Sequence, residues 1–190
     1  MNVNYKFEHE DTPLMLAAYA GNKKIAEFLL SKQAKVNDLN EDGRSALVVV
    51  AFMGHEDVAS LLIKNGADLH IEDRNGKTAL LWAVKQDHPQ MVKLLISSGA
   101  DINQQSREGR TALMEAVCHG FEDIVEFLIS EGADLNLKDS NHATALTLAY
   151  EFRQHRITRA LRKAGAQYSA PKVYRDDVME KWKKAFPKQK

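Results

Sequence analysis

Hydrophobic and polar positions recur along this chain with a period of 33 residues. The stretch 111–136, TALMEAVCHGFEDIVEFLISEGADLN, contains one unit of the pattern. In it a short apolar segment follows a threonine, a glycine ends that segment, and a second segment places apolar residues at helical spacing. Equivalent units open at Thr12, Ser45, Thr78 and Thr144. A fixed period of this length predicts a solenoid of stacked supersecondary units rather than one mixed core.

Each unit is expected to contain two helices. In the first unit Thr12 precedes Pro13, an order typical of a helix start, where a hydroxyl caps the helix and proline loses no hydrogen bond. Gly21 is expected to end this helix, because the left-handed conformation at a helix C-terminus favours glycine. The second helix is predicted over about residues 23–31, from apolar residues at helical spacing. The unit is therefore a helix hairpin.

Short polar segments link the units and are predicted to project as exposed β-turn or hairpin fingers. They are residues 37–44, 70–77, 103–110 and 136–143. All ten glycines fall at three repeat positions: the end of the first helix, the end of the second helix and the finger. Gln33 and Asp87 stand where other units have glycine. If Gln33 keeps the left-handed backbone, its β-carbon costs about 1 kcal/mol.

The units resemble the ankyrin repeat. The period of 33 residues and openings such as Thr12-Pro13-Leu14 and Thr111-Ala112-Leu113 carry the resemblance. Five units in register, residues 12–168, match it, although the histidine of the family's opening is replaced in each of them. The resemblance implies an all-α ankyrin-repeat solenoid of stacked helix-turn-helix units with projecting β-turn or hairpin fingers. It also implies a concave face, formed by fingers and first helices, that binds protein partners.

The segments on either side of the repeats are predicted to cover the ends of the stack. Residues 1–11 are expected to be an N-terminal cap in which Val3, Tyr5 and Phe7 lay an apolar face over the first helix pair. Residues 169–190 are expected to form an amphipathic C-terminal capping helix, because four apolar residues recur there at every fourth position. They are Tyr174, Val178, Trp182 and Phe186. Since this segment contains seven Lys or Arg against three Asp or Glu, docking on a partner groove or an anionic surface is the alternative.

Charge and cysteine content limit the possible functions. Positive and negative side chains balance at 26 each, so no global field attracts nucleic acid or an anionic membrane. The single cysteine, Cys118, excludes an intramolecular disulfide framework and a paired-cysteine zinc site. We find neither an N-terminal segment typical of a secretory signal nor an apolar run of membrane-spanning length. We therefore expect a cytoplasmic monomer that uses no cofactor or metal and binds neither nucleic acid nor membrane.

Glu115, Cys118 and His119 are the residues that come nearest to a chemical site. Cys118 and His119 are adjacent on a predicted helix, so their side chains diverge, and together they supply at most half of a metal site. Glu115 occupies a position that is apolar in the other units, and we expect it to be half exposed on the concave side and paired with His119. His55 and His88 are expected to be local hydrogen-bonding groups. An enzyme would require Glu115, Cys118 and His119 to share one pocket.

The predicted binding surface combines aromatic, methionine and cationic side chains, the types enriched at the centres of interfaces. Its residues are Tyr19, Phe52, Met53, Arg74, Lys77, Trp82, Arg107, Arg110, Glu115 and His119. They predict a protein partner with an acidic and apolar surface. In the alternative interpretation Phe52 and Met53 pack sideways on the next repeat, and the charges only keep the fingers soluble.

The sequence thus predicts a non-catalytic protein–protein interaction module of the adaptor, inhibitor or immunity type. The alternative is a nucleic-acid- or membrane-associated accessory protein that acts through the basic C-terminal helix. That alternative predicts binding that weakens steeply with salt.

Overall fold

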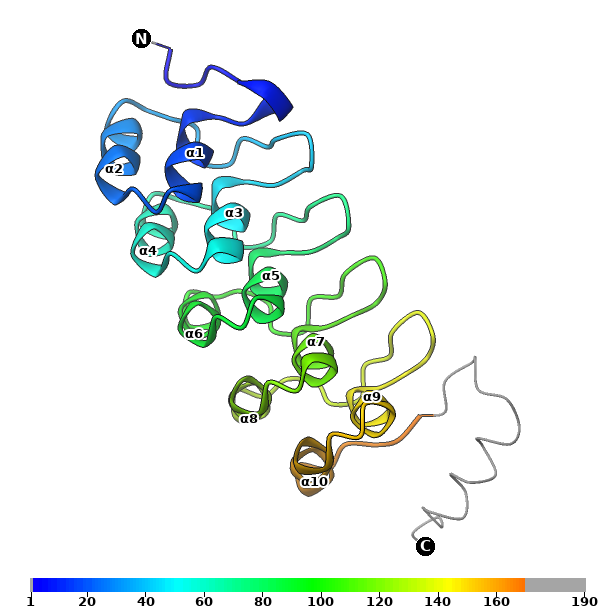
Figure 1. The fold of residues 1–190 in the computed structure, drawn as a ribbon. Coiled ribbons are helices and arrows are strands. Elements are labelled where there is room, and N and C mark those ends of the chain that lie inside the picture. The colour runs from blue at the N-terminus through cyan, green and yellow to red at the C-terminus, as the bar shows by residue number, and fades with distance from the viewer. Residues whose placement is uncertain (1, 170–190) are drawn as a thin grey trace, which may run out of the picture.

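The computed structural model describes residues 2–169, in which ten α-helices form five pairs and no β-strand is present (Figure 1). The first helices of the pairs are α1 (Pro13–Tyr19), α3 (Ala46–Met53), α5 (Ala79–Lys85), α7 (Ala112–His119) and α9 (Ala145–Glu151). The second helices are α2 (Lys23–Ser31), α4 (Glu56–Lys64), α6 (Pro89–Ser97), α8 (Glu122–Ser130) and α10 (His155–Lys163). A 3₁₀ turn, η1 (Glu8–Glu10), precedes them. The predicted all-α repeat solenoid is confirmed.

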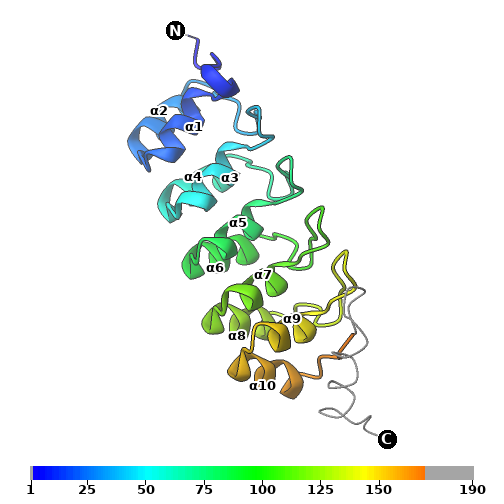
Figure 2. The same ribbon diagram turned by 45° about the vertical axis from the view of Figure 1, so that its right-hand side comes forward.

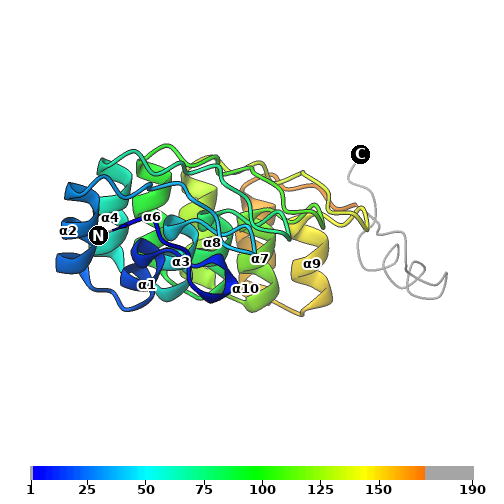
Figure 3. The same cartoon turned by 90° about the horizontal axis from the view of Figure 1, so that it is seen from above.

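The five helix pairs stack in a single row (Figures 1 and 2). First helices pack on first helices and second helices on second helices, so each repeat is covered by its neighbours. The fingers all project on the side of the first helices, and they follow one another when the stack is seen from above (Figure 3). We call the surface formed by the first helices and the fingers the inner face. The second helices form the outer face.

Local sequence signals set the ends of the helices. A Thr or Ser side chain accepts a hydrogen bond from the third helical N–H at the start of every first helix. These caps are Thr12, Ser45, Thr78, Thr111 and Thr144. Gln33 and Asp87, which replace glycine at helix ends, keep the left-handed backbone with φ of 63° and 56°. Both the caps and these two conformations were predictable from the repeat register.

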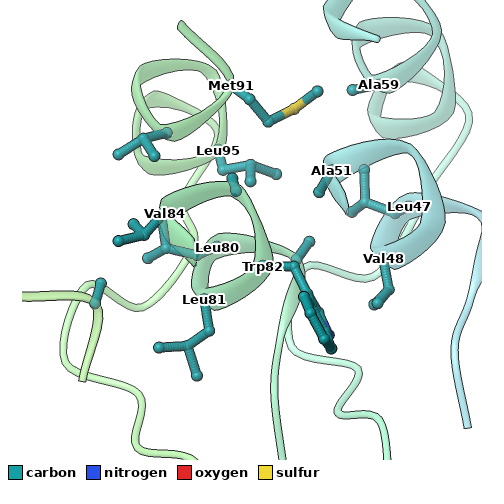
Figure 4. Packing of buried hydrophobic residues seen from close by; sticks show 14 of the residues in the cluster. Leu47, Val48, Ala51, Ala59, Leu80, Leu81, Trp82, Val84, Met91 and Leu95 are labelled. Atoms are coloured by element: carbon teal, nitrogen blue, oxygen red, sulfur yellow. The ribbon is translucent and has the colours of Figure 1, made fainter. Parts of the chain in front are cut away.

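The core is a continuous layer between successive pairs. Around α5, Leu80 and Val84 pack with Met91 and Leu95 of the outer helix, while the Trp82 ring points away from that helix (Figure 4). Alanines on the first helices keep the neighbouring helices close. The core therefore lies between the helices of adjacent repeats.

The fingers are joined to one another by backbone hydrogen bonds. The N–H of Arg74 donates to the carbonyl of Asp42 at 2.8 Å, and the N–H of Arg107 donates to the carbonyl of Asn75 at 3.1 Å. Finger tips are exposed, but finger bases are not, since Asp73 is only 4% exposed. The expectation of fully exposed fingers is therefore wrong for their bases, because side chains there supply the hydrogen bonds that shape each turn.

Residues 2–11 continue the repeat register towards the N-terminus. The side-chain oxygen of Asn4 accepts from the N–H of Lys35, as that of Asn37 accepts from Asp68 one repeat later. Of the three apolar residues expected to cover the first helix pair, only Val3 is buried; Tyr5 and Phe7 are 56% and 50% exposed. The predicted apolar face is therefore wrong, because Tyr5 and Phe7 lie in a finger-like segment and contact each other edge to face.

The predicted C-terminal capping helix, residues 169–190, lies outside the described residues apart from Ser169.

Candidate functional site

Trp82 lies at the centre of the inner face. Its side chain is 8% exposed, and its indole N–H donates to Asp73 Oδ2 at 3.0 Å. The Phe52 ring meets it edge to face, with 5.2 Å between the ring centroids. Phe52 therefore packs on the next repeat, as the alternative interpretation of the sequence expected, and positions an aromatic pair beneath the fingers.

Three cations surround the indole of Trp82. The Arg44 guanidinium lies 5.0 Å from a ring centroid, and the ammonium groups of Lys85 and Lys77 lie at 5.1 and 5.8 Å. Cations within about 6 Å of an indole are attracted by its quadrupole. The aromatic pair is thereby tied to two fingers and to the end of α5.

The cations at the finger bases are neutralised inside the protein. Arg44 approaches Asp73 of the next finger, with 3.9 Å between Nε and Oδ2, and Arg110 approaches Asp139 in the same way at 3.3 Å. Asp73 and Asp139 are buried, and each accepts two further hydrogen bonds from its own finger backbone. Each carboxylate thus stabilises the turn of its own finger and pairs with the cation of the preceding finger.

Lys77 cannot follow this pattern, because the next finger offers Ser106 instead of an aspartate. Its ammonium instead lies 2.5 Å from Glu115 Oε1 on α7, and the two side chains are 10% and 8% exposed. The predicted half exposure of Glu115 is therefore wrong. The reason is a long-range partner: a buried carboxylate is tolerated where a cation and hydrogen bonds compensate for lost water.

The predicted pairing of Glu115 with His119 is also corrected. The His119 ring donates from Nδ1 to the backbone carbonyl of Glu115 at 2.9 Å, not to its carboxylate, and stacks on Phe121. His119 is exposed at the end of α7. It is thus available at the surface, whereas the Glu115 carboxylate is held by Lys77.

A depression of about 440 Å³ lies between the two central fingers and the helices α5 and α7. Its lining is polar apart from the indole. The lining residues are Asn75, Lys77, Trp82, Lys85, Glu108, Arg110, Glu115 and His119. Five of the ten residues predicted for partner binding meet here: Lys77, Trp82, Arg110, Glu115 and His119.

Cys118 does not line the depression, although Glu115 and His119 do. Its sulfur accepts a hydrogen bond from the Arg110 guanidinium. Burial raises the pKa of the Cys118 thiol above its ordinary value, and this effect outweighs the opposing influence of Arg110. The thiol therefore favours its protonated form, which is the less nucleophilic one.

The remaining predicted residues are spread over the inner face. Tyr19 is half-buried on α1, and Met53 at the end of α3 is 39% exposed. Arg74 and Arg107 lie exposed at the tips of the two central fingers, and neither forms an ion pair with another residue in 2–169. The structure thus separates the predicted set into a central cluster, two cationic tips and an apolar N-terminal part.

His55 and His88 link successive repeats. Nε2 of His55 donates to the carbonyl of Tyr19, and Nε2 of His88 donates to the carbonyl of Phe52, both at 3.2 Å. They are hydrogen-bonding groups as expected, but their partners lie in the preceding repeat. Each satisfies a carbonyl at the C-terminal end of a first helix.

Four residues that shape this surface are not among the ten predicted for partner binding: Arg44, Asp73, Lys85 and Asp139. A signal was present. A short polar residue able to cap a turn recurs at positions 40, 73, 106 and 139, and a cation recurs at 44, 77 and 110. The recurrence of both sets at the 33-residue period indicates paired roles.

Within 2–169 no three His, Cys, Asp or Glu side chains come together as metal ligands would. Over the same range, no helix has the length and apolar character needed to span a membrane.

Comparison with known families agrees with this architecture. A family model described as ankyrin repeats (3 copies) matches residues 1–73, 65–139 and 102–172. No curated protein matches the chain.

Proposed function

The chain belongs to the ankyrin-repeat family, and from that premise we propose that it is a non-catalytic module that binds another protein through its inner face. Ankyrin repeats are generally protein–protein interaction modules. One observation supports this face in particular. Exposed apolar and cationic side chains, such as Met53 and Arg107, lie there beside fingers whose backbones are hydrogen-bonded to one another; we call these joined fingers the frame. Such side chains are enriched at interfaces.

The frame favours binding because little of it must become ordered. Finger backbones are already joined to their neighbours, through pairs such as Arg107 with Asn75 and Ser140 with Glu108. Association therefore costs mainly the side-chain freedom of the tips, and a preorganised surface binds more tightly than a mobile one of equal area. The ion pairs that Lys77 forms with Glu115 and Arg110 forms with Asp139 hold the finger bases in place.

We further propose an adaptor, inhibitor or immunity-type role in the cytoplasm. A surface that binds a partner is sufficient for each of these roles, and none of them requires a chemical reaction. The unpaired cysteine fits a reducing compartment.

Affinity capture from the native host with matched variants tests the proposal. The inner-face variant combines Met53→Asp with Arg107→Glu, and its outer-face match combines Ile25→Asp with Lys93→Glu. All four side chains are exposed, so both variants are expected to fold. Proteins captured by the wild type and by the outer-face variant, but lost with the inner-face variant, are the expected partners. Loss with the outer-face variant alone would contradict the proposal.

A further inference from the structure

The inner face changes character along the stack. The helix residues that line the central depression are Trp82, Lys85, Glu115 and His119. Two repeats earlier, 66 residues back, the same positions are held by four other residues. They are Leu16, Tyr19, Val49 and Met53, all apolar or aromatic. The surface that is polar in the centre of the stack is therefore apolar at its N-terminal end.

This apolar part is accessible. Leu16 is 42% exposed and Met53 is 39% exposed. Tyr19 is half-buried. Val49 and Trp82 occupy the same position as Leu16 in the next two repeats and are only 1% and 8% exposed. The exposure at this position is therefore greater in the first repeat than in the two that follow. Leu16 and Tyr19 lie three positions apart on one side of α1, and α3, which ends at Met53, packs on α1. Exposed apolar side chains on neighbouring elements indicate a contact surface more strongly than isolated ones do.

The fingers beside it are acidic. Residues 2–11 and 37–44 contain six carboxylates against two cations, Lys6 and Arg44, whereas residues 70–77 and 103–110 contain three against four. Four of the acidic side chains are exposed: Glu8, Glu10, Glu41 and Asp42. Three of the four have a partner, since Glu10 pairs with Lys6, Asp42 with Arg44 and Glu41 with the His9 ring. The four carboxylates nevertheless remain exposed, and six carboxylates against two cations leave a local excess of negative charge.

The two cations at the bases of the central fingers are already paired within the protein and are not free to bind an acidic partner. Lys77 and Arg110 are held by Glu115 and Asp139. The lysines of the first repeat, Lys23 and Lys24, lie on α2 in the outer row. The sequence suggested an acidic partner. The part of the face where apolar side chains are exposed instead favours a basic one, because the fingers beside it are acidic.

We propose that the N-terminal inner surface, formed by Leu16, Tyr19 and Met53 with Glu8, Glu10, Glu41 and Asp42, binds a segment of a partner protein that presents an apolar anchor flanked by Lys or Arg. The inference rests on the proposed function and adds the chemistry and the position of the contact. Apolar anchors supply most of the affinity of such contacts, and complementary charge supplies the rate of encounter and the orientation.

Selection from a displayed library of random 12-residue peptides, with the full-length protein as target, tests the chemistry directly. The expected enriched peptides combine a large apolar residue with net positive charge. The variant Glu41→Lys/Asp42→Lys is expected to weaken their binding at least about tenfold, because two charges change sign and the local charge rises by about four units. The matched variant Arg74→Glu/Arg107→Glu, at the next two finger tips, is expected to leave their affinity within about twofold. Circular dichroism of both variants checks folding.

The outcomes separate this inference from the proposed function. Enriched peptides that are acidic, and that lose binding with Arg74→Glu/Arg107→Glu, would overturn the inference and leave an inner-face binding module. Peptides that respond to neither pair but to Ile25→Asp/Lys93→Glu would overturn both. Enrichment of no binding peptide counts against the inference as well. Stronger binding by a synthetic peptide of residues 170–190 than by any selected peptide would make the chain's own C-terminal segment the occupant and would exclude a partner protein.

Discussion

Lys77 and Glu115 form an ion pair across two repeats, 38 positions apart in the sequence, with both side chains about nine-tenths buried. Lys77 lies at the base of a finger, and Glu115 lies on α7. The pair therefore joins the base of finger 70–77 to α7, and both of its side chains line the central depression. It also explains why a carboxylate occupies a position that is apolar in the other repeats.

Removing one partner of this pair is expected to be costly. Lys77→Ala or Glu115→Leu alone leaves a buried charge without compensation and is expected to destabilise the protein by about 3–5 kcal/mol. The double variant is expected to recover much of that loss, because Ala143 and Leu148 already occupy these repeat positions in the last repeat. Urea unfolding of the four proteins gives the coupling energy. Single-variant losses that simply add in the double variant would show that the pair is not coupled.

The close stacking of fingers predicts a difference between two glycines. Both Gly76 and Gly66 have a positive φ, at 69° and 84°, so alanine at either is strained by about 1 kcal/mol. A β-carbon on Gly76 would also lie 2.6 Å from the backbone nitrogen of Arg107, whereas one on Gly66 meets nothing within 4 Å. Gly76→Ala is therefore expected to cost about 1–3 kcal/mol more than Gly66→Ala, measured by chemical unfolding. Equal losses in the free energy of unfolding for the two variants would show that the close contact between fingers does not restrict the residue at position 76.

Gln33 offers a stabilising substitution. Its backbone has φ 63°, and the equivalent residues of the later repeats are glycines. Gln33→Gly removes the β-carbon strain and is expected to raise the free energy of unfolding by up to about 1 kcal/mol. A control, Lys32→Gly, places glycine at the neighbouring residue, where φ is −97°, and is expected to destabilise. A lower thermal midpoint for Gln33→Gly would contradict the strain argument.

Cys118 is expected to react slowly in the native protein. Burial raises the pKa of its thiol above the ordinary value of 9.0, so little thiolate is present at pH 8. Alkylation by iodoacetamide, followed by mass spectrometry, should be several-fold slower in buffer than in denaturant, and the chain has no other cysteine to confuse the reading. Equal rates in the two states would refute the assignment.

The same shift predicts a loss of stability at high pH. Well below pH 9.0 the thiol is protonated in both the native and the unfolded chain, so its contribution is constant. As pH rises through 9.0 the unfolded chain ionises first and binds fewer protons than the native state, so the free energy of unfolding falls. Cys118→Ser is expected to remove this part of the pH dependence, seen in unfolding curves between pH 8 and 10.

The sequence by itself determined the repeat. Threonine and serine caps, helix-ending glycines and the 33-residue period specified five helix pairs, and even the left-handed backbone at Gln33 and Asp87 followed from register. These features were readable because each depends on residues within one or two helical turns. Local capping and backbone geometry act over that distance, so spacing along the chain is sufficient to recognise them.

The tertiary structure alone decided the character of the inner face. Which cations remain free depends on partners 29 to 38 residues away: Asp139 neutralises Arg110 and Glu115 neutralises Lys77, whereas Arg107 stays exposed. The burial of Glu115 and the exposure of Tyr5 and Phe7 likewise depend on which neighbour covers them. Burial and charge compensation are properties of side chains brought together by stacking, and a residue's type does not reveal its partner.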